Sequence, residues 1–120
     1  MRRRYPLEAL KAVRQSAVDA QVREVAERAA GTAEARAEEE RARRRRQAEE
    51  ERARGSRNAE STRVDLGDAR VADLQAQATW ELAEQERIEA LQRRERAIAE
   101  TADVAAGLEQ SARADLARAQ

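Results

Sequence analysis

A stretch of almost continuous charge, residues 37–58, separates two long segments in which apolar residues recur at spacings of three and four. That spacing places the apolar side chains on one face of a helix, so each segment is predicted to be a long amphipathic helix. The charged stretch ends in Gly55-Ser56-Arg57-Asn58, the clearest turn signal in the chain. The expected fold is therefore all-α: a long two-helix antiparallel coiled-coil hairpin with a charged tip.

The helix and turn signals divide the chain into a basic tail, a first arm, a turn and a second arm, at residues 1–5, 6–54, 55–61 and 62–120. Pro6 suits the first turn of the first arm, and Gly55 is a plausible C-terminal cap for it. Ser61 or Thr62 can cap the second arm, and Thr62 with Asp65 resembles a weak capping box. The final residues look like the middle of a helix, so we expect the second arm to continue past residue 120 in the natural protein.

Gly31-Thr32 interrupts the first arm and leaves two alternatives. A lone glycine costs about 1 kcal/mol relative to alanine in a helix, which a long helix tolerates. A break at this point would give three helices instead of two. Good helix formers continue on both sides without a proline or a turn cluster, which favours one continuous helix.

A turn centred near Asn58 also sets the register between the arms. Large aliphatic residues then meet along the base of the hairpin, where Leu10 faces Leu108 or Ala105, Val18 faces Ile98, Val25 faces Leu91, and Ala29 faces Ile88. In the second arm, Leu91, Ile98, Ala105 and Ala112 share one heptad position, while Glu95 and Glu109 interrupt the neighbouring seam of Ile88, Ala102 and Leu116. The heptad register slips between Leu82 and Leu91, which predicts a stutter.

In the half of the hairpin nearest the turn, the two arms differ in their content of large apolar residues. The second arm is rich in them, whereas the first arm has mainly Ala and Arg. The apolar residues are Val64, Leu66, Val71, Leu74, Trp80 and Leu82. Two interpretations remain open. Arginine stems cover this face while their charged ends stay in water, or part of the face is exposed for a partner.

Composition excludes several kinds of chemistry. The chain has 24 basic and 24 acidic residues and neither Cys nor His, so a Cys/His metal site, a thiol nucleophile and a histidine base are all ruled out. Its paired carboxylates sit on helix faces without a pocket, and we expect no catalytic residue, cofactor or metal site. The arginine runs at residues 2–4 and 43–46 could touch phosphate, but acidic triplets flank the second, so nucleic acid is not expected as a partner.

The opening residues Arg4 to Arg14 resemble the start of a known family. Tyr5, Leu7, Leu10 and Arg14 match the aromatic, leucine, leucine and arginine pattern of the flagellar export protein FliJ and its injectisome counterparts, the YscO/SctO stalk proteins. The rest of the chain is similar to that family in being an Arg/Glu/Ala-rich antiparallel hairpin. The lack of Phe, the alanine-rich seam and the length are departures from the family pattern.

The resemblance implies a non-enzymatic stalk that couples the hexameric export ATPase of a type III secretion or flagellar apparatus to its export gate. Some family members also bind export chaperones. Tyr5, Leu7, Leu10 and Arg14 would lie at the ATPase end. The gate would meet residues chosen by position alone, namely Arg43, Arg44, Arg45, Arg46, Val71, Leu74 and Trp80.

No apolar run follows the basic start, so neither a signal peptide nor a membrane span is expected. The implied location is the cytoplasm, at the bacterial inner membrane through partners. Two other functions fit the sequence. One is an unrelated scaffold coiled coil that self-associates through the Val64–Leu82 face, and the other is an RNA- or membrane-surface binder that uses the arginine runs.

Overall fold

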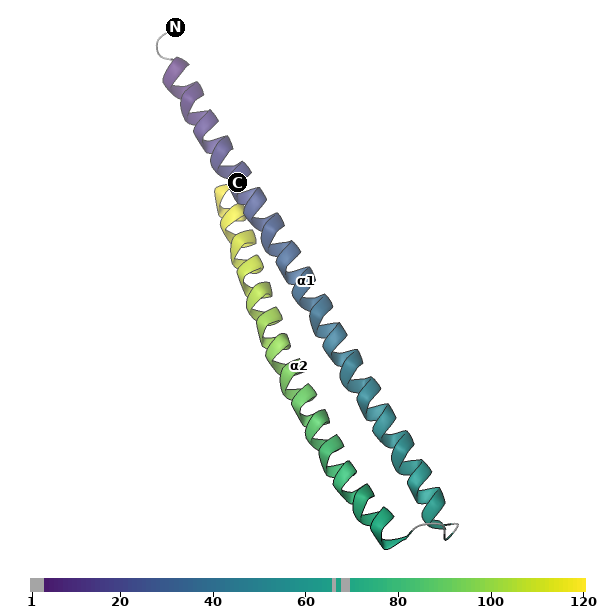
Figure 1. Ribbon diagram of the computed structural model, residues 1–120. Coiled ribbons are helices and arrows are strands. Elements are labelled where there is room, and N and C mark those ends of the chain that lie inside the picture. Colours follow the sequence, from purple (N-terminus) through teal and green to yellow (C-terminus); the bar gives the residue numbers. More distant parts are fainter. Residues whose placement is uncertain (1–3, 66, 68–69) are drawn as a thin grey trace. The chain divides into compact units, whose positions relative to one another are not determined.

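The computed structural model describes residues 4–65, 67 and 70–120. These residues form two long helices, α1 (Arg4–Asp65) and α2 (Val71–Ala119), and contain no strand. The two helices lie side by side in opposite directions (Figure 1). The predicted all-α, two-helix antiparallel hairpin is therefore confirmed. α1 passes through Gly31 as helix, so the three-helix alternative is wrong.

The turn lies further along the chain than predicted. Residues 55–61 are helical and belong to α1, so the turn assigned to them is wrong. Thr62 does not cap a second helix either, because it lies inside α1 and its hydroxyl donates a hydrogen bond to the Asn58 carbonyl oxygen at 3.0 Å. The side chain of Asp65, its proposed capping partner, lies outside the described residues. α1 also takes in Arg4 and Tyr5, which were assigned to the tail.

Local interactions at Gly67 and Arg70 show why the chain turns between the two helices. Gly67 has a φ of +74°, a conformation that only glycine adopts readily, and its N–H donates to the Val64 carbonyl oxygen at 3.0 Å. Arg70 precedes α2, and its backbone N–H donates to the Asp73 carboxylate at 3.3 Å. An acidic residue in the first turn of α2 also suits the positive end of the helix dipole.

Replacing the glycines tests the position of the turn. Gly55 lies inside α1 with nothing within 4 Å of an added Cβ, so Gly55→Ala should stabilise the chain by about 0.5–1 kcal/mol. Gly67→Ala should destabilise it by about 1 kcal/mol, because alanine is strained at positive φ. Thermal and urea unfolding followed by circular dichroism measure both. The opposite signs would place the turn at Gly55.

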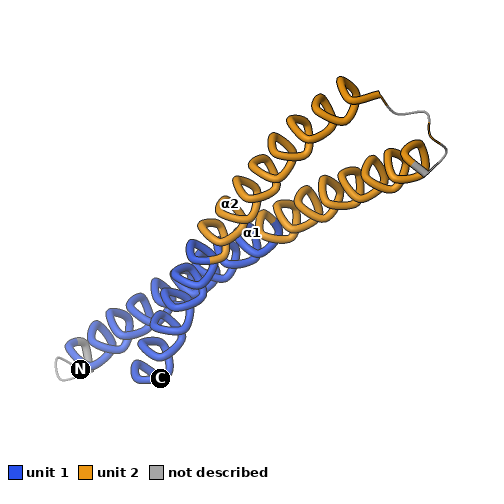
Figure 2. The backbone as a smooth tube through the Cα atoms, turned by 90° about the horizontal axis from the view of Figure 1, so that it is seen from below, with its two compact units in different colours: residues 1–37, 100–120 blue, residues 38–99 orange. Residues whose placement is uncertain are grey.

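Two compact units divide the hairpin, and each contains a piece of both helices (Figure 2). Unit 1 comprises residues 1–37 and 100–120, and unit 2 comprises residues 38–99. In unit 1 the buried or half-buried residues include Val18, Gln21, Val25, Thr32 and Ala35 of α1, and Ala102, Ala105, Glu109, Ala112 and Leu116 of α2. Steps of three and four residues separate most of them, so they form a coiled-coil seam.

The seam of unit 2 is much more polar. On α1 it comprises Glu39, Ala42, Arg46, Glu49, Ala53, Ser56 and Glu60, and on α2 it comprises Gln77, Trp80, Glu84, Ile88, Leu91, Glu95 and Ile98. Small α1 residues such as Ala42 and Ala53, only 6% and 3% exposed, sit among the long side chains. Such alternation of small and large residues lets two helices pack closely.

The heptad spacing of α2 changes once, as predicted. Trp80, Glu84 and Ile88 follow one another at two successive steps of four, which is a stutter. This change in spacing leaves Leu82 outside the seam, with 65% of its surface exposed. Leu82 therefore does not share the seam with Trp80, although the sequence groups both among the large apolar residues of this half.

The register between the helices follows from the position of the turn. Arg36 pairs with Asp103 at 3.0 Å in unit 1, and Arg46 pairs with Glu95 in unit 2. The predicted register is therefore wrong by roughly three heptads of α1. Its pairs of Leu10 with Leu108, Val18 with Ile98, Val25 with Leu91, and Ala29 with Ile88 do not form.

Candidate functional site

An arginine lies in the seam of unit 2 among carboxylates from both helices. Arg46 on α1 donates hydrogen bonds to Glu95 on α2 and to Glu50 one turn along α1, with the Glu50 distances at 3.0 and 3.1 Å. The Arg46 side chain is only 21% exposed. The two carboxylates raise the pKa of Arg46, most strongly through the hydrogen bond to Glu95. Gln92 adds a second bridge by donating to Glu50 at 3.5 Å.

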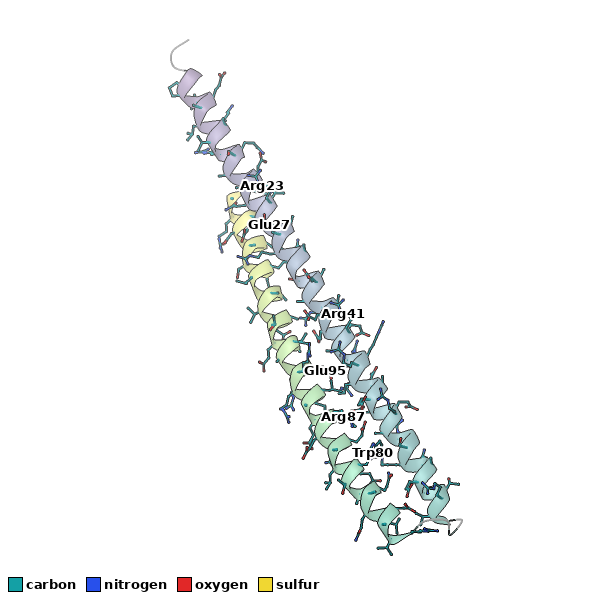
Figure 3. The ribbon with its side chains drawn as sticks, viewed as in Figure 1. Arg23, Glu27, Arg41, Trp80, Arg87 and Glu95 are labelled. Carbon is teal, nitrogen blue, oxygen red and sulfur yellow. The ribbon has the colours of Figure 1, made fainter. Side chains whose placement is uncertain are left out.

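A pair of buried carboxyl groups occupies the next layer of the seam toward the turn. Glu49 of α1 and Glu84 of α2 are only 8% and 3% exposed, and their carboxyl groups lie next to each other. Arg87 contacts Glu84 at 2.9 Å and Glu49 at 3.5 Å, while Arg52 contacts Glu49 at 3.3 Å. Figure 3 shows Arg87 and Glu95 on the same helix, α2.

The two carboxyl groups of this pair differ in acidity. The hydrogen bond from Glu84 lowers the pKa of Glu49, and the positive charges of Arg52 and Arg87 lower it further. The hydrogen bond to Glu49 raises the pKa of Glu84, and burial raises it further. When the pair carries one proton, these opposite shifts favour the proton on Glu84 and the charge on Glu49, because two carboxylates in contact repel each other.

A groove lies beside this carboxyl pair, between the parts of α1 and α2 that belong to unit 2. Its volume is about 550 Å³. Trp80, Ile88 and Ala53 contribute apolar surface, and the charged lining comprises Glu50, Arg54, Arg57, Glu81, Glu84 and Glu89. Trp80 is half-buried and labelled in Figure 3. The groove therefore combines the only tryptophan of the chain with charges of both signs.

The seam of unit 1 contains one carboxylate of its own. Glu109 on α2 is bonded to Arg113 at 2.9 Å and interacts with the Thr32 hydroxyl of α1. These two interactions, that of Arg113 first, hold the pKa of Glu109 below its usual range. A polar residue at a seam position is thus satisfied partly by its own helix and partly by the other.

Glu109 should make stability depend on pH in a defined direction. Because its pKa is lower in the folded chain, its stabilising effect is complete above its unfolded pKa and lost as the pH falls through its folded pKa. Glu109→Gln should therefore lower the melting temperature most at pH 7, and the difference should shrink at pH 3. Melting curves recorded between pH 3 and pH 7 test this pH dependence, and the variant Glu100→Gln, at an exposed position, is the control. A constant difference would contradict the assignment.

The residues predicted at the ATPase end lie on an uncovered part of α1. Leu7 and Leu10 are 60% and 46% exposed, and Arg14 is exposed as well. Leu7 and Arg14 occupy the heptad position of Gln21, and Leu10 lies three turns before Gln21. They therefore continue the face that contacts α2 further along. The side chain of Tyr5 lies outside the described residues.

The residues predicted at the gate end are not gathered at one place. The arginines 43–46 lie about 28–33 Å before the end of α1, at a rise of about 1.5 Å per residue. Arg43 and Arg44 both pair with Glu40, Arg45 is exposed, and Arg46 belongs to the seam. The predicted position of this arginine run at the tip of the hairpin is therefore wrong.

Apolar residues flank the actual turn. Val64, Val71 and Leu74 are 44%, 72% and 43% exposed, and Leu66 lies outside the described residues. Trp80 instead lines the groove together with Arg54 and Arg57. Arginines thus line the groove beside Trp80, whereas Val71 and Leu82 are exposed.

Sequence reasoning missed the Glu49–Glu84 pair. It identified Glu95 and Glu109 as polar interruptions of an apolar seam, and the structure places both in the seam. Glu84 carries the same signal, since it lies one turn from Trp80 and one turn from Ile88. Glu49 gave no signal, because it belongs to a run of three consecutive glutamates in a segment without large apolar residues.

Comparison with known proteins adds no relative. No family model matches the chain, and no curated protein or solved structure is significantly similar to it. Within the described residues, no three metal-ligating side chains are grouped so that they could hold an ion. No helix in that part of the chain is long and apolar enough to cross a membrane.

Proposed function

We propose that the chain is a non-enzymatic coiled-coil stalk of a bacterial type III secretion or flagellar export apparatus, and that it couples the hexameric export ATPase to the export gate. Its place would be the cytoplasm, at the inner membrane through these partners. The observation that carries the proposal is that Leu7, Leu10 and Arg14, the residues of the family resemblance, are exposed and lie together on one face of α1.

The exposed start of α1 has the properties of a helix that binds a protein. All residues from Pro6 to Ala17 are exposed, and Leu7, Leu10 and Val13 among them are at least 46% exposed. Large apolar side chains at helical spacing favour docking into an apolar groove of a partner. Lys11 and Arg14 beside them favour a partner with acidic groups around that groove.

The test combines the chain with the purified export ATPase from the same cell and measures binding and the ATP hydrolysis rate. The chain should bind and raise the rate. Leu7→Glu with Leu10→Glu should weaken binding by at least roughly tenfold, because apolar anchors each contribute about 2 kcal/mol or more. The matched control is Ala9→Glu with Ala12→Glu, which adds the same charge to the opposite face of α1 and should leave binding unchanged.

Two results would reject this function. One is the absence of any binding to the ATPase, and the other is equal weakening by both pairs of substitutions. Helix content measured by circular dichroism should be the same in all the variants, because every substituted residue is exposed.

The exposed apolar residues near the turn favour a second candidate, a scaffold protein that self-associates. Val71 and Leu82 are 72% and 65% exposed, and burial of such residues between two copies would be favourable. Analytical ultracentrifugation over a wide concentration range separates the candidates. A dimer that Val71→Glu with Leu82→Glu abolishes, together with no ATPase binding, would support the scaffold.

A further inference from the structure

We propose that the Glu49–Glu84 carboxyl pair is a proton-operated joint in unit 2. When the pair shares one proton, α1 and α2 are held together there. Loss of that proton loosens the two helices between the pair and the turn and opens the groove beside Trp80. This inference is independent of the proposed function.

The geometry of the seam places this pair at a sensitive position. Glu49 and Glu84 are the most buried charged residues of the described chain, and they come from opposite helices. One oxygen of Glu84, Oε1, is completely buried and has no hydrogen-bond donor from the protein. A proton shared by the two carboxyl groups would give this oxygen a partner, whereas a second negative charge would leave it without one.

On the turn side of the pair, few large apolar side chains pack in the seam between α1 and α2. Seam residues of α1 there are small or polar, namely Ala53, Ser56 and Glu60, and Ala53 lines the open groove together with Trp80 and Ile88. On the other side of the pair, Arg46 binds Glu95 and half-buried Leu91 and Ile98 follow. Repulsion at the pair should therefore open the turn side first.

The surrounding charges determine which protonation state closes the joint. From α1, Arg52 contacts Glu49, and from α2, Arg87 contacts both carboxyl groups. The other charged groups facing the groove beside the pair are Glu50, Arg54 and Arg57 of α1, and Glu81 and Glu89 of α2. The two arginines in contact with the pair can balance the charge of an ionised Glu49. If Glu84 is ionised as well, its oxygen Oε1 carries negative charge without a hydrogen-bond donor.

Closure of the joint should weaken on both sides of an optimal pH. The pKa of Glu84 is raised in the closed joint, so closure weakens as the pH rises through that raised value. The pKa of Glu49 is lowered, so closure also weakens as the pH falls through its lowered value. The joint is tightest between these values. A group whose pKa differs by one between the closed and open joint changes the opening equilibrium by about tenfold.

Spin labels can measure the joint directly, because the chain has no cysteine. Ala59→Cys on α1 and Ala78→Cys on α2 are exposed positions on the turn side of the pair, and Ala26→Cys with Ser111→Cys provides a reference pair in unit 1. Electron–electron distance measurements on the full-length chain between pH 3 and 8 should show the unit 2 distance shortest in mild acid. It should become longer and broader toward pH 8, while the unit 1 distance stays constant over that rise.

Glu84→Gln is the decisive variant. Its amide can donate to Glu49 at every pH, so the unit 2 distance should stay short up to pH 8. The control Glu86→Gln, an exposed residue of the same helix, should keep the full pH response. Fluorescence of Trp80, the only tryptophan, should follow the same transition. The proposal is overturned if the unit 2 distance is constant from pH 4 to 8, or if Glu84→Gln responds to pH like the unsubstituted chain.

Discussion

Ile98→Asp should destabilise the hairpin by about 3 kcal/mol and lower its melting temperature by roughly 10 °C. Ile98 is half-buried in the seam of unit 2, next to the layer in which Arg46 meets Glu95. The substitution removes an aliphatic side chain from the interface and places a carboxylate there without a donor. It also adds a negative charge one turn from Glu95. Circular dichroism at 222 nm during heating measures the effect.

Leu10→Asp is the matched control, because it makes the same kind of change in the exposed start of α1. Leu10 is 46% exposed and α2 does not cover it. Its substitution should change stability by no more than about 0.5 kcal/mol. The alternative register, with Leu10 opposite Leu108, instead predicts that both variants lose a comparable free energy of unfolding. Equal melting curves for Leu10→Asp and Ile98→Asp would thus contradict the structure.

The sequence was sufficient for the fold class and for the stutter, because both depend on the spacing of residues along one helix. The turn was not predictable in the same way. Gly55-Ser56-Arg57-Asn58 is a stronger turn signal than Gly67 by composition, yet α1 continues through it. One glycine costs about 1 kcal/mol, which strong helix formers and packing of Ala53 and Glu60 against α2 can offset.

The position of the turn also determines which residues of α1 and α2 meet at the candidate site. Pairing across the hairpin depends on where the chain reverses, so the register of every layer shifted together. Apolar periodicity could not correct it, because the seam of α1 in unit 2 consists of alanine and charged residues rather than large aliphatic ones. Such a seam is specified by its cross-helix polar pairs, which a single sequence does not reveal.

The grouping of the residues near the start of α1 did not need the register, because it depends only on spacing along one helix. Leu7, Leu10 and Arg14 form a stripe on one helix whatever α2 does. The structure adds that this stripe is uncovered and continues the seam face. The gate-end residues depended on the turn, and they are accordingly scattered between the seam, the groove and the surface.

Reversing the charge of Arg46 is the second substitution for which we expect a large effect. Arg46→Glu should cost about 2–3 kcal/mol, because it removes the cation shared by Glu50 and Glu95 and places a third carboxylate beside them. Glu95→Arg alone should also destabilise the chain, since two guanidinium groups then meet in the seam. The side chains of Arg46 and Glu95 are only 21% and 20% exposed, so water screens these charges incompletely.

The double variant shows whether the two positions are in contact. Combining Arg46→Glu with Glu95→Arg restores an ion pair across the helices, so the combined loss should be smaller than the sum of the single losses by at least about 1 kcal/mol. Full recovery is not expected, because Glu50 still lies one turn from position 46 on the same helix. Urea unfolding of the four proteins gives the coupling energy.

A surface pair provides the reference for this cycle. Arg54 and Glu51 contact each other at 3.0 Å within α1 and are 62% and 76% exposed, so their swap should show a coupling of only about 0.2–0.5 kcal/mol. A turn at residues 55–61 would separate Arg46 from Glu95 and give no coupling between them. A coupling near zero would therefore refute the register of unit 2, whereas a large one can arise only if α1 and α2 meet at this layer.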